Sequence, residues 1–264
     1  MIGQKKNLET IMKWRCNKST PHFIIISGEL GSGRLTLSKV IMKMLNAQGI
    51  ICGCGIDDVR KVIDYAYTIS APTMYIFRDA DDMSVNAKNA LLKVVEEPPR
   101  NVYFIMTVKN LDNMLSTIRS RATVINMEHY SKEELQSVRE DELLLEYCSN
   151  IGQLQVDKSQ VKRVEECVDD VIKAFSEKSG TKLLKTCTQL RSKQTEEDKI
   201  DCLLFFRVFQ KRLYNAYDSS LIQIINVDYL LKCKKELSRN TVNKKASIEC
   251  MLVKMLDDLK NEVG

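Results

Sequence analysis

The sequence contains few of the residues that interrupt helices, with only 4 prolines and 10 glycines among 264 residues. Nor does it contain an uninterrupted apolar run of about 18 residues, the length that a membrane-spanning helix needs. The first ten residues, MIGQKKNLET, lack the apolar segment of a secretory signal peptide. Hydrophobic residues make up 44% and charged residues 28%, as in ordinary globular proteins. We therefore expect a helix-rich cytoplasmic protein with no membrane contact.

Histidine is scarce, and the cysteines are scattered. The two histidines, His22 and His129, are far apart in the sequence and offer no catalytic pairing. Of the nine cysteines, only Cys52 and Cys54 form a close pair. A structural zinc site requires four ligands, so we expect no metal site and no disulfide framework.

Acidic residues are few at the start of the chain, where residues 1–50 hold 8 Lys and Arg but only 2 Asp and Glu. A basic segment of this kind suits phosphates or nucleic acid. The alternative is a solvated helix face, and charge alone favours that reading.

Apolar runs typical of buried parallel strands occur at 23–27, 74–77, 102–106 and 123–125, and helical patterns lie between them. Strands that alternate with helices predict a parallel α/β sheet. One helix is expected to begin after Ser84 and to stop at Pro98–Pro99, and another spans 111–118. After about residue 130 only helical patterns remain, at about 131–148, 158–177, 181–191, 197–215, 220–236 and 245–261. The sequence therefore predicts an α/β domain followed by an all-α region, and its length is enough for about two domains.

The segment GELGSGRLTLS (28–38) follows the first expected strand and opens a helix. It nearly matches the phosphate-binding pattern G-x-x-x-x-G-K-[ST], with Gly28, Gly31 and Gly33 positioned to let backbone N–H groups surround a phosphate. Arg34 replaces the lysine of that pattern. Leu35 replaces the hydroxyl residue, and Thr36 comes one position late. By itself the segment is equally consistent with a tight turn between strand and helix.

The strand at 74–77 leads to Asp79, as in a Walker B strand whose carboxylate holds the Mg²⁺ of a nucleotide. The next residue is Ala80, where ATP-hydrolysing sites of this type carry a glutamate. An aspartate that only caps the loop remains the alternative.

Two longer segments make the pattern specific: NALLKVVEEPP (Asn89–Pro99) and TIRSR (Thr117–Arg121), with an apolar strand leading to Thr107 between them. The chain resembles the bacterial DNA polymerase III clamp-loader family of AAA+ proteins, and most resembles its delta-prime subunits. That resemblance implies a RecA-like parallel sheet with a phosphate loop at 1–128, a short helical lid at 129–156 and an all-α collar domain for oligomerisation at 157–264.

The resemblance also implies roles for single residues. Arg121 would be an arginine finger that reaches the γ-phosphate bound by a neighbouring subunit. RSR alone would favour a surface ion pair; the TIRSR context favours the finger. For Glu96–Glu97, at the end of a helix, a contact with a basic neighbour and a solvated pair stay open. The following residues would form a degenerate nucleotide site: Gly28, Gly31, Gly33, Arg34, Thr36, Asp79 and Thr107.

Departures from the family affect the chain's own site. They are Arg34, Leu35, Ala80 and Gly152, which stands where active members carry the sensor-2 arginine of the lid. The residue that serves a neighbour, Arg121, is retained. We therefore expect weak ATP or ADP binding at most and no autonomous ATPase activity.

The expected function is that of a non-hydrolysing delta-prime-like subunit in DNA replication. Its expected partners are gamma/tau-like and delta-like subunits and, through the complex, the sliding clamp and primed DNA. Two alternatives remain: a gamma/tau-like ATPase with an atypical phosphate loop, and an AAA+-derived DNA-binding regulatory protein.

Overall fold

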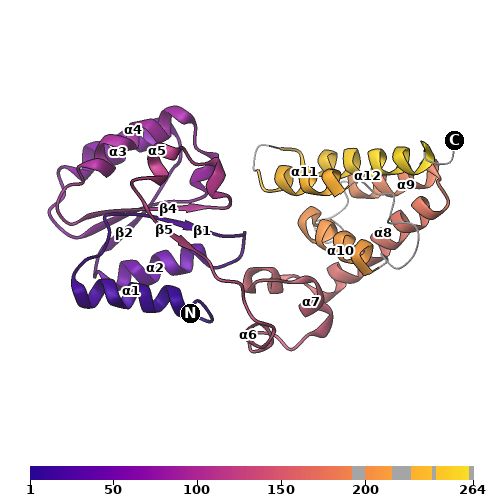
Figure 1. Ribbon diagram of the computed structural model, residues 1–264, viewed down its shortest axis with the longest axis horizontal. Coiled ribbons are helices and arrows are strands. Elements are labelled where there is room, and N and C mark those ends of the chain that lie inside the picture. Colours follow the sequence, from indigo (N-terminus) through magenta and orange to yellow (C-terminus); the bar gives the residue numbers. More distant parts are fainter. Residues whose placement is uncertain (192–199, 216–226, 240–241, 262–264) are drawn as a thin grey trace. The chain divides into compact units, whose positions relative to one another are not determined.

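The computed structural model describes residues 1–191, 200–215, 227–239 and 242–261, and these divide into two compact units (Figure 1). Unit 1 comprises 1–140 and 149–154, and unit 2 comprises 141–148 and 155–264. The range expected as a lid, 129–156, contributes to both units. The division into three domains stays a prediction.

Unit 1 contains a five-stranded, fully parallel sheet in the order β2-β3-β4-β1-β5. Four of its strands lie where the apolar runs predicted them. The strands are β1 (Phe23–Ser27), β2 (Gln48–Cys52), β3 (Thr73–Phe77), β4 (Val102–Val108) and β5 (Thr123–Asn126). The carboxyl ends of β1, β3 and β4 therefore lie next to one another at one edge.

Helices cover both faces of this sheet (Figure 1). On one face α1 (Lys5–Asn17) and α2 (Arg34–Met44) pack through Ile11, Leu37 and Ile41. On the other face lie α3 (Ile56–Ala66), α4 (Val85–Glu96) and the short α5 (Ser116–Arg119). Each central strand is covered on both faces, so its side chains are apolar on both sides. This is why continuous apolar runs predicted these strands.

Two local expectations differ from the structure. The segment before α3 contains β2, which the sequence did not predict because an edge strand with exposed Gln48, Gly49 and Ile51 carries no continuous apolar run. The helix expected over 111–118 is instead a 3-10 turn, η2 (Leu111–Asn113), followed by α5. A second 3-10 turn, η1 (Ala80–Asp82), follows β3.

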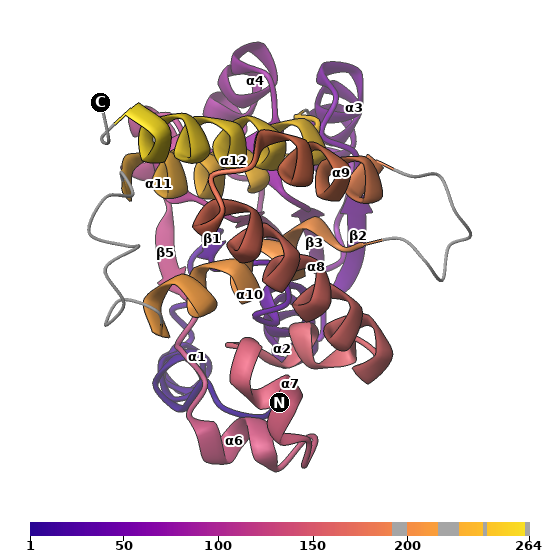
Figure 2. The same ribbon diagram turned by 90° about the vertical axis from the view of Figure 1, so that its right-hand side faces the viewer.

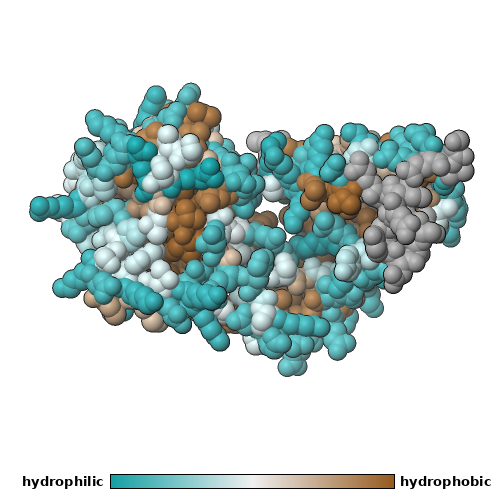
Figure 3. Space-filling model, in the orientation of Figure 1, coloured by the Kyte–Doolittle hydropathy of each residue, from teal (hydrophilic) through white to brown (hydrophobic). Residues whose placement is uncertain are grey.

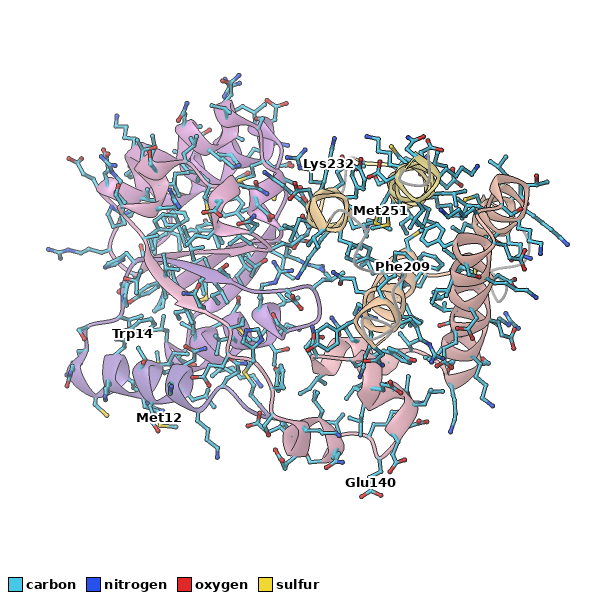
Figure 4. The ribbon with its side chains drawn as sticks, turned by 45° about the vertical axis from the view of Figure 1, so that its right-hand side comes forward. Met12, Trp14, Glu140, Phe209, Lys232 and Met251 are labelled. Carbon is cyan, nitrogen blue, oxygen red and sulfur yellow. The ribbon has the colours of Figure 1, made fainter. Side chains whose placement is uncertain are left out.

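Unit 2 is helical throughout its described residues (Figure 2). Its core includes Phe175, Phe205 and Phe209, and the ring centroids of Phe205 and Phe209 lie 6.0 Å apart. Phe209 and Met251 point into the helical bundle (Figure 4). The helices of unit 2 are α7 (Glu142–Tyr147), α8 (Lys158–Ser176), α9 (Gly180–Arg191), α10 (Cys202–Asn215), α11 (Val227–Leu237) and α12 (Lys244–Asn261).

The expected helix over 131–148 is interrupted, since α6 (Lys132–Gln136) and α7 are separate elements. The expected starts of two later helices, at 197 and 220, fall outside the described residues. On the face seen in Figure 3, polar side chains cover most of each unit, and hydrophobic residues show through in the middle of unit 1. Within the described ranges, no helix is both long enough and apolar enough to span a membrane.

Candidate functional site

The loop between β1 and α2 has the backbone geometry that its glycines permit. Gly31 and Gly33 have φ angles of 87° and 94°, in the left-handed region where glycine carries no steric penalty. Gly28 donates its N–H to the carbonyl of Val108 at 3.1 Å, which ties the start of the loop to the end of β4. The sequence-predicted loop therefore lies between a buried strand and a helix N-terminus, the setting of a phosphate-binding loop.

Arg34, the first residue of α2, is only 7% exposed and is turned into the molecule. Its Nη2 lies 3.0 Å from Oδ1 of Asp79, which follows β3. The backbone N–H of Asp79 in turn donates to Oγ1 of buried Thr107 on β4, at 3.1 Å. The structure thus brings Arg34, Asp79 and Thr107 together in one hydrogen-bonded chain at the carboxyl edge of the sheet.

Burial and charge together favour the ion pair between Arg34 and Asp79. Burial lowers the pKa of the Arg34 guanidinium, while the carboxylates of Asp79 and Asp81 act in the opposite direction. An arginine retains its proton in proteins, so Arg34 stays a cation and needs a counter-charge. Asp79 supplies it, and the carboxylate expected to hold Mg²⁺ is therefore engaged by the chain's own arginine.

Two further positions hold apolar side chains where a working site has polar ones. Leu35 packs into the core beneath α1 and α2, and Thr36 is exposed. Ala80 is completely buried in the core beneath α3 and α4. The structure therefore brings neither a hydroxyl from position 35 nor a carboxylate from position 80 to the loop.

A segment distant in sequence, residues 149–154, is bonded directly to the loop. Asn150 donates from Nδ2 to the carbonyl of Leu30 at 3.1 Å, and Gly152 donates its N–H to the carbonyl of Gly31 at 3.1 Å. A Cβ at position 152 would lie 2.4 Å from the Cα of Gly31. No side chain fits at position 152 unless one of these backbones moves, so the family's arginine at this position is incompatible with the observed contact.

Beside the loop is a cavity of about 230 Å³ at the carboxyl ends of β1 and β5. Most of its lining residues are of polar types, and they come from the loop itself, the chain after β5 and the 149–154 segment. The lining residues are Ser27, Gly28, Glu29, Ser32, Lys109, Asn126, Met127, Glu128, His129, Tyr130, Ser149 and Asn150.

Arg121 lies after α5 and is 38% exposed. Its Nη1 donates to the carbonyl of Thr117 at 2.8 Å, and its Nη2 lies 2.5 Å from Oε1 of Glu96, the last residue of α4. The sequence left open whether Glu96 contacts a basic neighbour, and the structure shows that it does. The surface ion pair that RSR alone favoured is present, and the guanidinium remains accessible to solvent.

Comparison with known proteins finds similarity to subunits of DNA polymerase III. The family model described as "DNA polymerase III, delta subunit" matches residues 51–131. The DNA polymerase III subunit gamma of Buchnera aphidicola subsp. Schizaphis graminum is 25% identical over 166 residues, covering 51% of this chain and 46% of the relative. The DNA polymerase III subunit tau of Bacillus subtilis is 27% identical over 152 residues, covering 46% of this chain and 27% of the relative.

Over about half of its length, the chain resembles subunits of the DNA polymerase III clamp-loader family. It spans less than half the length of the two curated relatives described above.

Solved structures show the fold. A DNA polymerase III gamma subunit-related protein from Thermotoga maritima matches with a TM-score of 0.55 and 17% identity, over 94% of this chain and 99% of that one. A point mutant of RuvB from the same organism matches with a TM-score of 0.52 and 14% identity, over 100% of this chain and 89% of that one. The AAA+ fold with a helical C-terminal region, expected from the sequence, is thus confirmed.

Proposed function

We propose that this chain is a non-hydrolysing, delta-prime-like subunit of a clamp loader. In this proposal it acts in the cytoplasm, joins gamma/tau-like and delta-like subunits through its helical unit 2, and presents Arg121 to the ATP bound by a neighbour. The assembly would load a sliding clamp onto primed DNA. Similarity to clamp-loader subunits supports the general role, and the arrangement around Arg34 and Arg121 supports the specific one.

The observation that carries the proposal is the state of the chain's own phosphate loop. A working loop offers a cation to the phosphates and leaves the Walker B carboxylate free for Mg²⁺. Here Arg34 and Asp79 are bonded to each other, and residues 149–154 are hydrogen-bonded along the loop. The site also lacks a carboxylate that would orient the water for hydrolysis, because position 80 is a buried alanine.

Arg121 is in the opposite situation. It lies at the surface, and its permanently charged, forked guanidinium suits the oxygens of a transferring phosphoryl group. An arginine supplied by a neighbour contributes charge where the transition state develops it. A subunit with a closed site of its own and an accessible arginine can therefore serve as an activator of the next subunit.

The test is to purify the chain together with the gamma/tau-like motor subunit of its own cell and to measure ATP hydrolysis. We expect Arg121→Ala to leave assembly intact and to lower the rate on the order of 10³-fold, the scale of an arginine finger. Arg119→Ala is the matched control, because Arg119 is a nearby surface arginine that pairs with Asp112 at 3.6 Å. An assembled Arg121→Ala complex with unchanged hydrolysis would refute the assignment.

A second candidate is a gamma/tau-like ATPase, and the relatives described above are named gamma and tau subunits. One structural observation favours it: Oγ of Ser32 and Nη1 of Arg34 are buried at the loop and lack a hydrogen-bond partner among the described residues. These two groups could donate to an anion. The candidate requires micromolar binding of Mg-ATP and measurable turnover by the isolated chain, which calorimetry and a phosphate-release assay would detect.

A further inference from the structure

The ion pair between Arg121 and Glu96 joins two elements of unit 1 that are held firmly by the core. Glu96 ends α4, whose neighbouring residues Val94 and Val95 are buried, and Pro98 follows. Arg121 follows α5, whose Ile118 is completely buried in the same core cluster. Since both backbones are fixed by packing, the contact between the two side chains is set by rigid elements and not by a loose loop.

Glu96 occupies a position that is unfavourable without a basic partner. The C-terminus of a helix carries partial negative charge, so a carboxylate there is disfavoured. The guanidinium of Arg121, 2.5 Å away, offsets that cost. The carboxylate in turn limits where this guanidinium points, because a fork bound on one side has fewer orientations available.

The guanidinium is not used up by these contacts. Arginine has five N–H donors; Nη1 donates to the carbonyl of Thr117 and, at 3.5 Å, to Oγ of Ser120, while Nη2 contacts Glu96. Nε and the second hydrogen of Nη2 remain for another acceptor. Arg121 can therefore bind phosphate oxygens while Glu96 still holds it.

We propose that Glu96 is a positioning residue for Arg121: it orients the guanidinium so that its free donors are presented to the nucleotide of a neighbouring subunit. This inference rests on the proposed function of Arg121. The property of Glu96 that matters in this inference is the oxygen atom that accepts from Nη2, and not the negative charge of the carboxylate. A carboxylate that merely competed with phosphate would slow the finger, whereas an acceptor that orients it speeds the reaction.

The chain offers a matched control in the next residue. Glu97 carries the same charge one position further along, is exposed, and has no ion pair with any residue in the described parts of the chain. Glu97→Ala therefore removes an equal charge near Arg121 without removing the contact.

The experiment measures ATP hydrolysis by the assembled clamp loader carrying each variant. We expect Glu96→Ala to lower kcat on the order of fivefold with unchanged KM for ATP, because the reacting groups lose alignment. Glu96→Gln keeps an acceptor oxygen and should retain most of the wild-type kcat, and Glu97→Ala should match the wild type. Unchanged kcat in Glu96→Ala, or faster hydrolysis in both Glu96 variants, would overturn the inference.

A double variant separates this inference from the proposed function. If Glu96 acts only through Arg121, Glu96→Ala adds no further loss to Arg121→Ala. Additive losses would show that Glu96 acts by another route. If Arg121→Ala itself has no effect in an assembled complex, the proposed function fails as well; if only the Glu96 variants have no effect, this inference fails alone.

A second measurement needs no partner. Arginine side-chain NMR on the isolated full chain reports how freely each guanidinium moves. We expect Glu96→Ala to raise the mobility of the Arg121 guanidinium and to leave that of Arg119 unchanged, with Glu97→Ala affecting neither. Equal mobility of Arg121 in the wild type and in Glu96→Ala would contradict a positioning role.

Discussion

Arg34 and Arg121 of unit 1 each pair with a carboxylate, yet these two pairs lie in different environments. Arg34 is 7% exposed and Asp79 27%, whereas Arg121 is 38% exposed and Glu96 43%. The first pair closes the chain's own phosphate loop. The second lies at the surface, where a further acceptor can approach.

The difference shows how burial assigns roles to one side-chain type. A cation withdrawn from water requires its partner, so Arg34 is committed to Asp79. An ion pair in contact with water contributes little to stability and can exchange or share its partner at low cost. The guanidinium of Arg34 is therefore held within the chain's own phosphate-loop site, whereas that of Arg121 remains accessible to a further acceptor.

The sharpest test of this comparison removes one carboxylate charge from each pair. Asp79→Asn should destabilise unit 1 by about 2 to 3 kcal/mol, because a buried cation loses its counter-charge. Asparagine is the suitable replacement, since Asp79 has a φ angle of 50° and asparagine tolerates that left-handed conformation. Urea unfolding followed by tryptophan fluorescence reports on unit 1, because Trp14 is the only tryptophan in the chain.

The matched variant is Glu96→Gln, the same change of carboxylate to amide at the surface pair. We expect it to lower stability by at most about 1 kcal/mol, as for exposed ion pairs generally. Equal losses in the two variants would mean that burial does not distinguish the pairs.

The contact between Gly152 and Gly31 is the next largest expected effect. Gly152→Ala would place a methyl group 2.4 Å from a backbone carbon, so residues 149–154 must move away from the loop. We expect a loss of about 1 to 2 kcal/mol, typical of overpacking. Hydrogen exchange at the N–H of position 152 should accelerate at the same time.

Gly55→Ala is the control for that variant, because a Cβ there would meet only the side-chain carboxylate of Asp58, with Oδ2 at 3.3 Å, and no backbone atom. Its stability should stay within about 0.5 kcal/mol of the wild type. Should Gly152→Ala be equally mild, the loop and the 149–154 segment are not held together as tightly as the contact implies.

The smallest expected effect concerns restoring the phosphate-loop residues. The double variant Arg34→Lys, Leu35→Thr recreates the GK[ST] ending of the pattern. We expect Mg-ATP to bind more weakly than about 1 mM, that is with less than about 4 kcal/mol of binding free energy, because residues 149–154 still contact the loop. Calorimetry checks this, and micromolar binding would show that residues 34 and 35 alone had silenced the site.

Local features of the fold were accessible from the sequence. Ser84 was expected to begin a helix, and its side chain accepts a hydrogen bond from the N–H of Ala87 at the start of α4. Pro98–Pro99 were expected to stop that helix, which ends at Glu96. Such features depend on residues close together in the chain, whose preferences act through short-range sterics and hydrogen bonds. The sequence did not predict the edge strand β2, because a strand that is paired on one side only does not require a continuous apolar run.

The sequence by itself determined the class of fold, the place of the phosphate loop and the residues missing from it, because these follow from apolar periodicity, glycine geometry and side-chain chemistry. Tertiary structure alone decided that Arg34 meets Asp79, that Gly152 meets Gly31 and that Arg121 meets Glu96. The residues in these pairs are far apart in the chain, so their distance and burial depend on how the sheet and helices pack. That packing buries Arg34 beside Asp79 and leaves Arg121 exposed.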